Sequence, residues 1–406
     1  MAARPRLLFV APWFLFPRVS GGRIRTTDVL RGMKGGAFEI TLASPAPADG
    51  RDWSAELASI CDHFVGWRDD TRRSALRRVL HLASPLPVSV ALDRSPNARA
   101  CLARELARGP DVVVFDFVHT AVLLPDDALP MRAVAFTHNV ESEIFARDVA
   151  LARNPLARAV WRSQHRKMTR FERAALRRAD AVVAVSERDA ERFRRELGIE
   201  TVHAIPTGVD LDFYAFRPRA DGGDATSAGR LVFTGSMDWR PNIDALEWLM
   251  REAWDAIVAS SPQAALTIVG RDPPGRLIAA AQQRGLRWTF TGRVEDVRPF
   301  IRTADACVIP IRAGGGTRLK VYEAMALGCP VVSTGIGAEG LPIADGEHYL
   351  RADAGRDFAA AVRRLLGDAA LRARLATAAR AHVEANGSLQ RVGRAFEAIC
   401  LEGVTG

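Results

Sequence analysis

Short apolar runs alternate with segments of helical periodicity along most of the chain. The runs are nearly continuous in apolar residues, as is typical of strands that are covered on both faces. Segments of about ten to twenty residues that fit helices lie between most of them, and this alternation predicts parallel sheets with right-handed crossovers. The runs predicted as strands are Leu7–Ala11, Phe38–Ala43, Asp111–Phe117, Ala133–Thr137, Ala181–Val185, His203–Pro206, Leu231–Thr234, Ala265–Val269, Trp288–Thr291, Ala306–Pro310 and Val331–Thr334.

One stretch interrupts this pattern. Residues Arg217–Arg230 read RPRADGGDATSAGR and lack apolar periodicity, which indicates a linker. We therefore predict an α/β protein with two doubly wound, Rossmann-like domains. The N-terminal domain would span residues 1–210, the linker 211–229 and the C-terminal domain 230–385, and a last helix in 386–406 would return to the N-terminal domain. Two such domains facing each other would place a ligand in the cleft between the carboxyl ends of their strands.

Length and composition agree with this picture. A chain of 406 residues is long enough for two domains, and 48% hydrophobic with 25% charged residues excludes wholesale disorder. Five scattered cysteines without a CxxC motif argue against a zinc site or a disulfide framework and favour the cytoplasm. The chain begins with basic residues and an apolar run, but Pro12 and Pro17 favour a buried strand over a signal peptide. No apolar run is long enough to span a membrane.

The net charge of +9 comes mainly from arginine, since Lys34, Lys167 and Lys320 are the only lysines. We do not expect nucleic-acid binding, because no basic stripe with interleaved aromatic residues accompanies the charge. The segment Leu151–Arg178 holds nine basic residues against Glu172, which gives it a charge of +8. Such a segment predicts either a solvated helix face or a contact with an anionic membrane.

The strongest motif is GGGTRLKVYEAMALGCPVVST, which begins just after a predicted strand. Gly314, Gly315 and Gly316 allow the backbone to approach a ligand closely. A helix is predicted to begin near Thr317, so the amides at this end form an anion site that suits a diphosphate.

The same motif supplies charged side chains. Arg318 and Lys320 add cationic donors, and Glu323 lies one helical turn beyond Lys320 on the same face. A carboxylate there can accept two hydroxyl groups of a ribose. The alternative is a glycine loop that precedes a surface helix with an ordinary lysine–glutamate pair.

A second glycine loop follows the first predicted strand. Gly21 and Gly22 precede a helix and can place amides near a phosphate or an acceptor hydroxyl; the alternative is a plain turn. Arg23 and Arg25 could meet an anionic acceptor, but we expect them on a solvated helix face.

Polar residues also end two other predicted strands. His138 and Asn139 follow one strand, and Asp116 ends another. This position at the carboxyl edge of a sheet makes a functional His138 as plausible as a structural one. Glu141 could instead cap the helix that follows.

These motifs resemble glycosyltransferase family 4 (group 1), whose members have the GT-B fold. The resemblance rests on GGGTRLKVYEAMALGCPVVST together with FTGSMDWRPN (Phe233–Asn242) and IPTGVD (Ile205–Asp210). It implies transfer of a sugar, with retention of configuration, from a nucleotide-diphosphate sugar to a hydroxyl of a glycan or lipid-linked acceptor. It also implies no cofactor other than that co-substrate and no metal.

The resemblance assigns roles to individual residues. The expected catalytic residues are His138, Arg318 and Lys320. The expected donor-binding residues are Gly22, Gly235, Arg240, Gly314, Gly315, Gly316, Thr317 and Glu323, with Glu323 on the ribose. The protein would be cytoplasmic, and an additional peripheral contact with the inner face of the membrane is part of this hypothesis.

The chain departs from the family pattern at the donor site. Gly315 stands where the family often has a glutamate that contacts the sugar. Ser236 and Asn242 stand where the family usually has an arginine and a lysine on the diphosphate. Arg240 lies nearby, and Arg318 with Lys320 could take over the diphosphate.

Three other functions are alternatives: a non-catalytic binding protein, a nucleotide-sugar epimerase and a dinucleotide oxidoreductase. A non-catalytic nucleotide- or sugar-binding protein would explain the departures, and a nucleotide-sugar epimerase would share the fold. GIGAEG (Gly335–Gly340) matches the dinucleotide fingerprint, but the polar, Pro342-containing sequence after it does not predict the required helix. Asp210 and Asp212 match a two-aspartate metal motif at the hinge, and we expect no metal there.

Overall fold

The computed structural model describes residues 4–71, 74–152, 154–216, 229–313 and 318–404. The chain divides into two compact units. Unit 1 contains the residues up to Pro206 together with those from Leu389 on, and unit 2 contains most of the chain between them. The predicted linker falls largely on residues 217–228, which lie outside the described residues.

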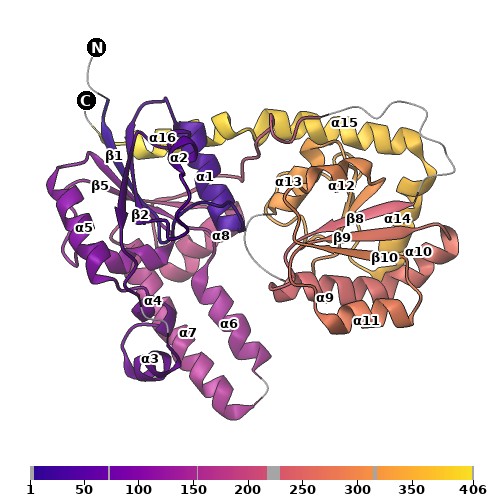
Figure 1. Ribbon diagram of the computed structural model, residues 1–406, viewed down its shortest axis with the longest axis horizontal. Helices are drawn as coiled ribbons and strands as arrows, with labels where there is room; N and C mark the ends of the chain where they lie inside the picture. Colours follow the sequence, from indigo (N-terminus) through magenta and orange to yellow (C-terminus); the bar gives the residue numbers. More distant parts are fainter. Residues whose placement is uncertain (1–3, 72–73, 153, 217–228, 314–317, 405–406) are drawn as a thin grey trace. The chain divides into compact units, whose positions relative to one another are not determined.

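Unit 1 is built around a parallel sheet with helices on both faces (Figure 1). The strand order is β3-β2-β1-β4-β5-β6-β7. Its strands are β1 (Arg6–Val10), β2 (Glu39–Pro45), β3 (His63–Trp67), β4 (Val112–Asp116), β5 (Arg132–Phe136), β6 (Ala181–Ala184) and β7 (Val202–Ala204). Its helices are α1 (Gly21–Met33), α2 (Ser54–Ala58), α3 (Ala75–Leu80), α4 (Val88–Leu92), α5 (Pro96–Ala107), α6 (Glu141–Leu151), α7 (Pro155–Leu176), α8 (Glu187–Arg192) and α16 (Leu389–Leu401).

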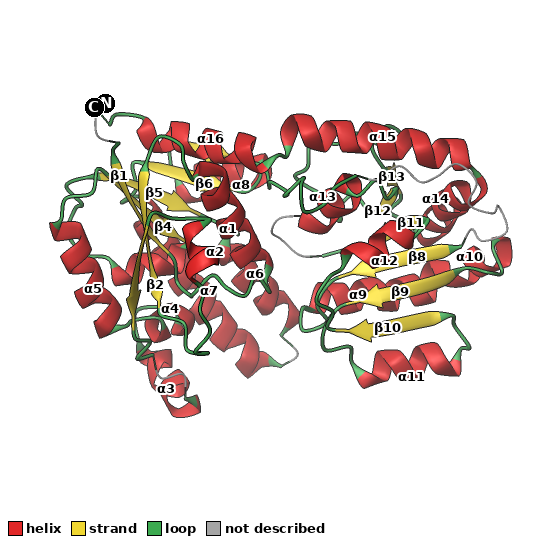
Figure 2. Ribbon diagram, turned by 45° about the horizontal axis from the view of Figure 1, so that its top comes forward, coloured by secondary structure: helices red, strands yellow, loops and turns green. Residues whose placement is uncertain are grey.

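Unit 2 repeats this architecture with the strand order β10-β9-β8-β11-β12-β13 (Figure 2). Its strands are β8 (Arg230–Thr234), β9 (Ala265–Val269), β10 (Trp288–Gly292), β11 (Ala306–Ile309), β12 (Val331–Ser333) and β13 (Leu350–Arg351). Its helices are α9 (Arg240–Trp248), α10 (Trp254–Ser260), α11 (Gly275–Gln283), α12 (Arg298–Thr303), α13 (Leu319–Ala326), α14 (Gly355–Gly367) and α15 (Ala369–Asn386).

The strands confirm the predicted fold class. Every strand pair in both sheets is parallel, and each predicted run overlaps one strand of the structure. The central strand β4 is buried along its whole length, which explains its apolar run VVVF before Asp116 at the carboxyl end. The sequence patterns missed β3 and β13. Edge strand β3 is only half-buried and contains a glycine, and β13 has two residues, so neither produces an apolar run.

Helix α16, near the end of the chain, packs against α1 in unit 1. The two helices approach so closely that a Cβ on Gly32 would lie 2.1 Å from the carbonyl oxygen of Leu389, and Gly393 faces Gly32 from the other side. Glycine at both positions permits this contact. None of the helices in the described ranges is both long and apolar enough to cross a membrane.

Both sheets reverse their strand order at one point, between β1 and β4 in unit 1 and between β8 and β11 in unit 2. Ligands of doubly wound sheets bind at such a point, outside the carboxyl ends of the strands. The segments that leave these strands therefore position the candidate site.

Candidate active site

The candidate site of unit 2 begins where α13 starts. Gly314, Gly315, Gly316 and Thr317 lie outside the described residues, so their predicted role stays a prediction. Arg318 directly precedes the first turn of α13 and is buried, with 6% of its side chain exposed. Its Nη2 lies 3.3 Å from Oε2 of Glu339, which belongs to the GIGAEG segment.

The GIGAEG segment forms turns after β12, and no helix begins directly after it. A dinucleotide fingerprint requires such a helix, so the interpretation of this segment as a loop is confirmed. Gly337 packs under the loop, where an added Cβ would lie 2.7 Å from the carbonyl oxygen of Ile309. The segment thus supplies Glu339 to Arg318 and does not form a helix-borne phosphate site of its own.

Lys320 lies in the first turn of α13 and extends toward α9. Its Nζ donates a 2.8 Å hydrogen bond to Oδ1 of Asn242, and it lies 4.6 Å from the ring centre of Phe233. Burial lowers the pKa of Lys320 to about 8. An ammonium group held in a poorly solvated place gains more from an added anion than one in water.

Glu323 lies one turn further along α13. Its Oε1 accepts a 2.7 Å hydrogen bond from the hydroxyl of Tyr214. The backbone around Tyr214 is itself held, because Nη1 of Arg380 donates to the carbonyl oxygens of both Tyr214 and Ala326. Sequence reasoning missed Tyr214, which lies beside the hinge aspartates and carries no motif of its own.

The loop between β8 and α9 is built on Gly235 and Asn242. Gly235 has a φ of +154°, and a Cβ there would lie 2.6 Å from Nδ2 of Asn242. That Nδ2 donates a 2.7 Å hydrogen bond to the carbonyl oxygen of Ser236. The side-chain amide of Asn242 therefore binds two groups: its nitrogen donates to the loop, and its oxygen accepts from Lys320.

Two arginines flank this loop. Arg240 is the first residue of α9, as its place before Pro241 predicts, and its side chain is exposed. Arg271 follows β9. Its Nε donates a 2.8 Å hydrogen bond to the hydroxyl of Ser236, and its guanidinium forms an ion pair with Asp238. Sequence reasoning missed Arg271, because it is distant in sequence and one of many arginines.

In unit 1, His138 and Asp116 form a buried pair. Nε2 of His138 lies 2.6 Å from Oδ1 of Asp116, while Oδ2 of Asp116 accepts a 2.7 Å hydrogen bond from the hydroxyl of Thr26. His138 is 5% exposed and Asp116 is fully buried. Burial lowers the pKa of His138, with the Asp116 carboxylate opposing that change. A neutral imidazole that donates its Nε2–H to Asp116 in this way can accept one directed hydrogen bond at Nδ1.

Phe117 links His138 to Gly22. The Phe117 and His138 rings are stacked, with centres 3.8 Å apart and planes within 4°. A Cβ on Gly22 would lie 2.6 Å from Cζ of Phe117, so only glycine fits at this position of α1 without displacing the ring. Phe117 has a φ of +63°, which is a strained backbone for an aromatic residue. Strain of this kind concentrates at functional sites.

The expected solvated position of Arg25 is wrong. The residue is 1% exposed, its Nη2 donates a 2.7 Å hydrogen bond to the carbonyl oxygen of Ile205, and it lies 5.3 Å from the ring centre of Phe136. Burial lowers its pKa to about 9, opposed first by Asp116. The helix face that carries Arg25 turns toward the sheet, and the carboxylates around it make burial of the charge tolerable.

Glu141, the other residue weighed at this edge, begins α6 but does not cap it. The carboxylate of Glu172 on α7 instead accepts from the backbone amides of Glu141 and Ser142, at 2.7 and 3.0 Å. Burial raises the pKa of Glu172 to about 7.

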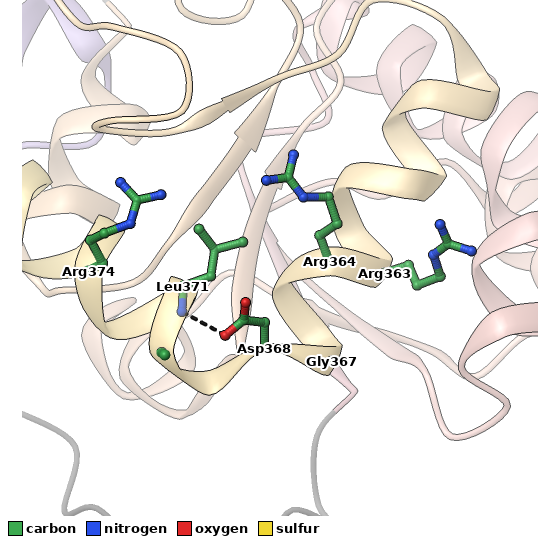
Figure 3. Close-up of a pocket in the computed structure, with 7 residues that line it drawn as sticks. Arg363, Arg364, Gly367, Asp368, Leu371 and Arg374 are labelled. Carbon is green, nitrogen blue, oxygen red and sulfur yellow. Dashed lines mark hydrogen bonds between the residues drawn. The ribbon is translucent and has the colours of Figure 1, made fainter.

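Two hollows in the described surface are not lined by the candidate donor-binding residues of α13. One of about 560 Å³ lies between α14 and α15, lined by Arg363, Arg364 and Arg374, and Asp368 there accepts from the backbone amide of Leu371 (Figure 3). It lies on helices and not at the carboxyl ends of strands. A smaller hollow in unit 1 includes Trp67 at the end of β3. No three His, Cys, Asp or Glu side chains gather as a metal site would require anywhere in the described ranges.

Comparison with known proteins extends these observations. The chain is 31% identical over 168 residues to a phosphatidyl-myo-inositol mannosyltransferase of Mycobacterium tuberculosis, covering 41% of this chain and 43% of the relative. It is 33% identical over 194 residues to a 2-deoxystreptamine N-acetyl-D-glucosaminyltransferase of Streptomyces fradiae, covering 43% and 44%. The chain spans less than half of the length of these two curated relatives.

Solved structures match nearly the whole chain. A sucrose-phosphate synthase from Thermosynechococcus elongatus is 19% identical, covers 98% of both chains and has a TM-score of 0.70. The HepE protein of Anabaena in complex with UDP is 15% identical, covers 97% of this chain and 99% of its own, and has a TM-score of 0.68. At these identities the likeness shows the fold, and this fold is GT-B.

Two family models match the chain, one on each half. Residues 19–213 match Glycosyltransferase Family 4, and residues 228–368 match Glycosyl transferases group 1. The two matches follow each other in the expected order and cover both candidate sites. The chain therefore belongs to the group 1, family 4-like glycosyltransferases.

Proposed function

We propose that the protein is a retaining glycosyltransferase that moves a sugar from a nucleotide-diphosphate sugar to a hydroxyl of a glycan or lipid-linked acceptor. The observation that carries this proposal is the arrangement on α13, where Arg318, Lys320 and Glu323 lie within two turns at the reversal point of the unit 2 sheet. Related folds solved with UDP and with UDP-glucose support a nucleotide sugar as donor.

The charges on α13 suit a leaving diphosphate. Lys320 and Arg318 are cations with little access to water, and they lie at the positive end of a helix dipole. Negative charge grows on the diphosphate as the bond to the sugar breaks. Fixed positive charge nearby stabilises that state more than the ground state, so the help is mainly electrostatic. In this proposal Glu323, oriented by Tyr214, accepts the ribose hydroxyls.

The carboxyl edge of the unit 1 sheet is proposed to serve the acceptor and the transferred sugar. His138 is held by Asp116 and Phe117, so its ring cannot turn freely. Retention of configuration, carried over from the family, fits front-side attack directed by the leaving phosphate. A lipid-linked acceptor would be met at the inner face of a membrane, which makes peripheral membrane contact part of the proposal.

The first experiment is a thermal-shift panel with UDP, GDP, ADP and dTDP. A nucleotide at about one hundred times its Kd adds roughly 2.7 kcal/mol to stability, which gives a clear rise in Tm. We expect a rise with one nucleotide, its loss in Glu323→Ala, and its persistence in the control Asp357→Ala, an exposed carboxylate on α14. A flat panel for the unaltered protein would contradict donor binding at α13.

Turnover separates binding from catalysis. Incubation of the corresponding nucleotide sugar with the protein and candidate acceptors should release the nucleoside diphosphate only when a hydroxyl acceptor is present. Binding without release would favour a non-catalytic binding protein. A changed sugar without any acceptor would favour an epimerase.

A further inference from the structure

Helix α3 presents an apolar face to solvent. Leu76, Val79 and Leu80 are spaced by three and four residues, which places them on one side of the helix. Their exposed fractions are 70%, 63% and 64%, and Leu82 in the following 3-10 turn η1 (His81–Ala83) is 40% exposed. An amphipathic helix on a soluble protein normally turns such a face toward the core. Exposed apolar residues gathered in one place mark an interaction surface.

Helix α7 lies next to this segment and fixes its position. Nζ of Lys167 donates a 2.7 Å hydrogen bond to the carbonyl oxygen of Leu82, and the buried Oε1 of Gln164 accepts one of 2.8 Å from the amide of Val88. Both views place α3 and α7 at the same end of unit 1 (Figures 1 and 2). Leu156 in the first turn of α7 is also 77% exposed.

A row of arginines follows the exposed side of α7. Its members are spaced by four, four, four and three residues, so they share one face of the helix; they are Arg158, Arg162, Arg166, Arg170 and Arg173. All are exposed. Among the described residues, no carboxylate forms an ion pair with the three central arginines. Arg77 and Arg78 on α3 add two more exposed cations.

The geometry points to a docking surface for an anionic lipid bilayer, formed by the apolar face of α3 with η1 and by the arginine row of α7. The apolar side chains would enter the boundary between head groups and acyl chains, as those of interfacial amphipathic helices do. The arginines would meet lipid phosphates, since basic residues near such a surface are attracted by its negative potential. A second copy of the chain would leave a row of like charges uncompensated, which disfavours it as the occupant.

This inference deepens the proposed function, because it gives the surface by which the enzyme would reach a lipid-linked acceptor. The contact itself needs neither donor nor acceptor. Its test therefore fails or succeeds independently of the nucleotide panel.

The test is co-sedimentation of the full chain with vesicles. Phosphatidylcholine vesicles containing roughly one third phosphatidylglycerol should bind the protein at least about tenfold more tightly than pure phosphatidylcholine vesicles. Two triple variants, Leu76→Ser/Val79→Ser/Leu80→Ser and Arg162→Gln/Arg166→Gln/Arg170→Gln, should each lose most of this binding. The matched control Arg356→Gln/Arg363→Gln/Arg364→Gln removes the same charge from exposed positions on α14 and should bind like the unaltered protein.

The substituted side chains are exposed, so the variants should keep the Tm of the unaltered protein, and this is measured alongside. Equal loss of binding in the α14 control would show a response to net charge alone and overturn the proposal. Full binding of the vesicles by the α3 variant would show that the apolar face of α3 does not enter the bilayer and would overturn the proposed surface. A dimer in size-exclusion chromatography that the α3 variant converts to a monomer would assign the surface to a second copy.

Discussion

The ammonium group of Lys320 donates a 2.8 Å hydrogen bond to Oδ1 of Asn242, which joins the start of α13 to the start of α9. Asn242 occupies the position at which the family usually carries a lysine. In this chain a lysine from another helix reaches the same place. Lys320 therefore supplies a cation at this point of the proposed diphosphate site, although the motif around Asn242 lacks one.

Replacing this cation should weaken nucleotide binding. Lys320→Gln removes a charged hydrogen bond of about 1.5–3 kcal/mol, so the affinity for the nucleoside diphosphate should fall roughly ten- to a hundredfold. Isothermal titration calorimetry measures this directly. The control is Arg312→Gln, an exposed cation that pairs with Asp244. Equal affinities for Lys320→Gln and the unaltered protein would remove Lys320 from the diphosphate site.

The affinity should also depend on pH. Burial lowers the pKa of Lys320 to about 8, so the charged fraction falls from about nine tenths at pH 7 to about one tenth at pH 9. Nucleotide affinity should decline over this range in the unaltered protein and stay flat in Lys320→Gln. The effect of Lys320 on the free energy of unfolding changes with pH in the opposite direction to its effect on nucleotide affinity. Between pH 8 and the unfolded value of 10.5 the unfolded chain binds more protons, so this lysine makes stability rise with pH.

Tyr214 should act on the nucleotide through Glu323. Tyr214→Phe removes the 2.7 Å hydrogen bond that orients the carboxylate, and nucleotide affinity should fall about fivefold, equivalent to roughly 1 kcal/mol. The control is Tyr322→Phe on α13, the helix that carries Glu323. The buried Tyr322 hydroxyl has no hydrogen-bond partner within the described part of the chain. That control should leave affinity unchanged. An unchanged affinity in Tyr214→Phe as well would show that Glu323 needs no support from Tyr214.

The contrast between Tyr214 and Lys320 shows what the sequence could predict. Lys320 belongs to a contiguous glycine-rich motif at a strand end, and the strand–helix alternation predicted that strand end correctly. Tyr214 reaches Glu323 across 109 positions of sequence, and a lone tyrosine in a hinge gives no local signal. Arg25 was misplaced for a related reason. Its burial depends on Asp116 and Ile205, which are brought to α1 only by the folded sheet.

Gly22 should be sensitive to an added methyl group, and its neighbour should not. Gly22→Ala places a Cβ 2.6 Å from Cζ of Phe117, so the ring that stacks on His138 must shift. Overpacking of this kind costs about 1–3 kcal/mol and should lower the Tm of unit 1. Gly21→Ala meets nothing within 4 Å and should be neutral or slightly stabilising, since alanine favours helix over glycine. Equal Tm values for the two variants would show that Phe117 moves without cost.

Asp116 should contribute strongly to the stability of unit 1 as well as to the orientation of His138. Asp116→Ala leaves Thr26 and His138 without their shared acceptor and leaves Arg25 without the carboxylate that most opposes the decrease in its pKa. Loss of one partner in such a buried cluster costs roughly 3–5 kcal/mol. Differential scanning calorimetry should show a Tm lower by several degrees, whereas Asp126→Ala, which removes an exposed carboxylate, should leave the Tm nearly unchanged.

The pH dependence follows from the lowered pKa of His138. Below the unfolded value of 6.5 the unfolded chain binds a proton that folded His138 resists, so this residue makes stability fall as the solution is acidified. His138→Gln should remove that part of the acid dependence, because glutamine does not titrate. If unit 1 of the unaltered protein lost no more stability than that of His138→Gln between pH 7 and pH 5, the pKa of the buried imidazole would not be lowered. Its role as a neutral, directed hydrogen-bonding group would then be wrong.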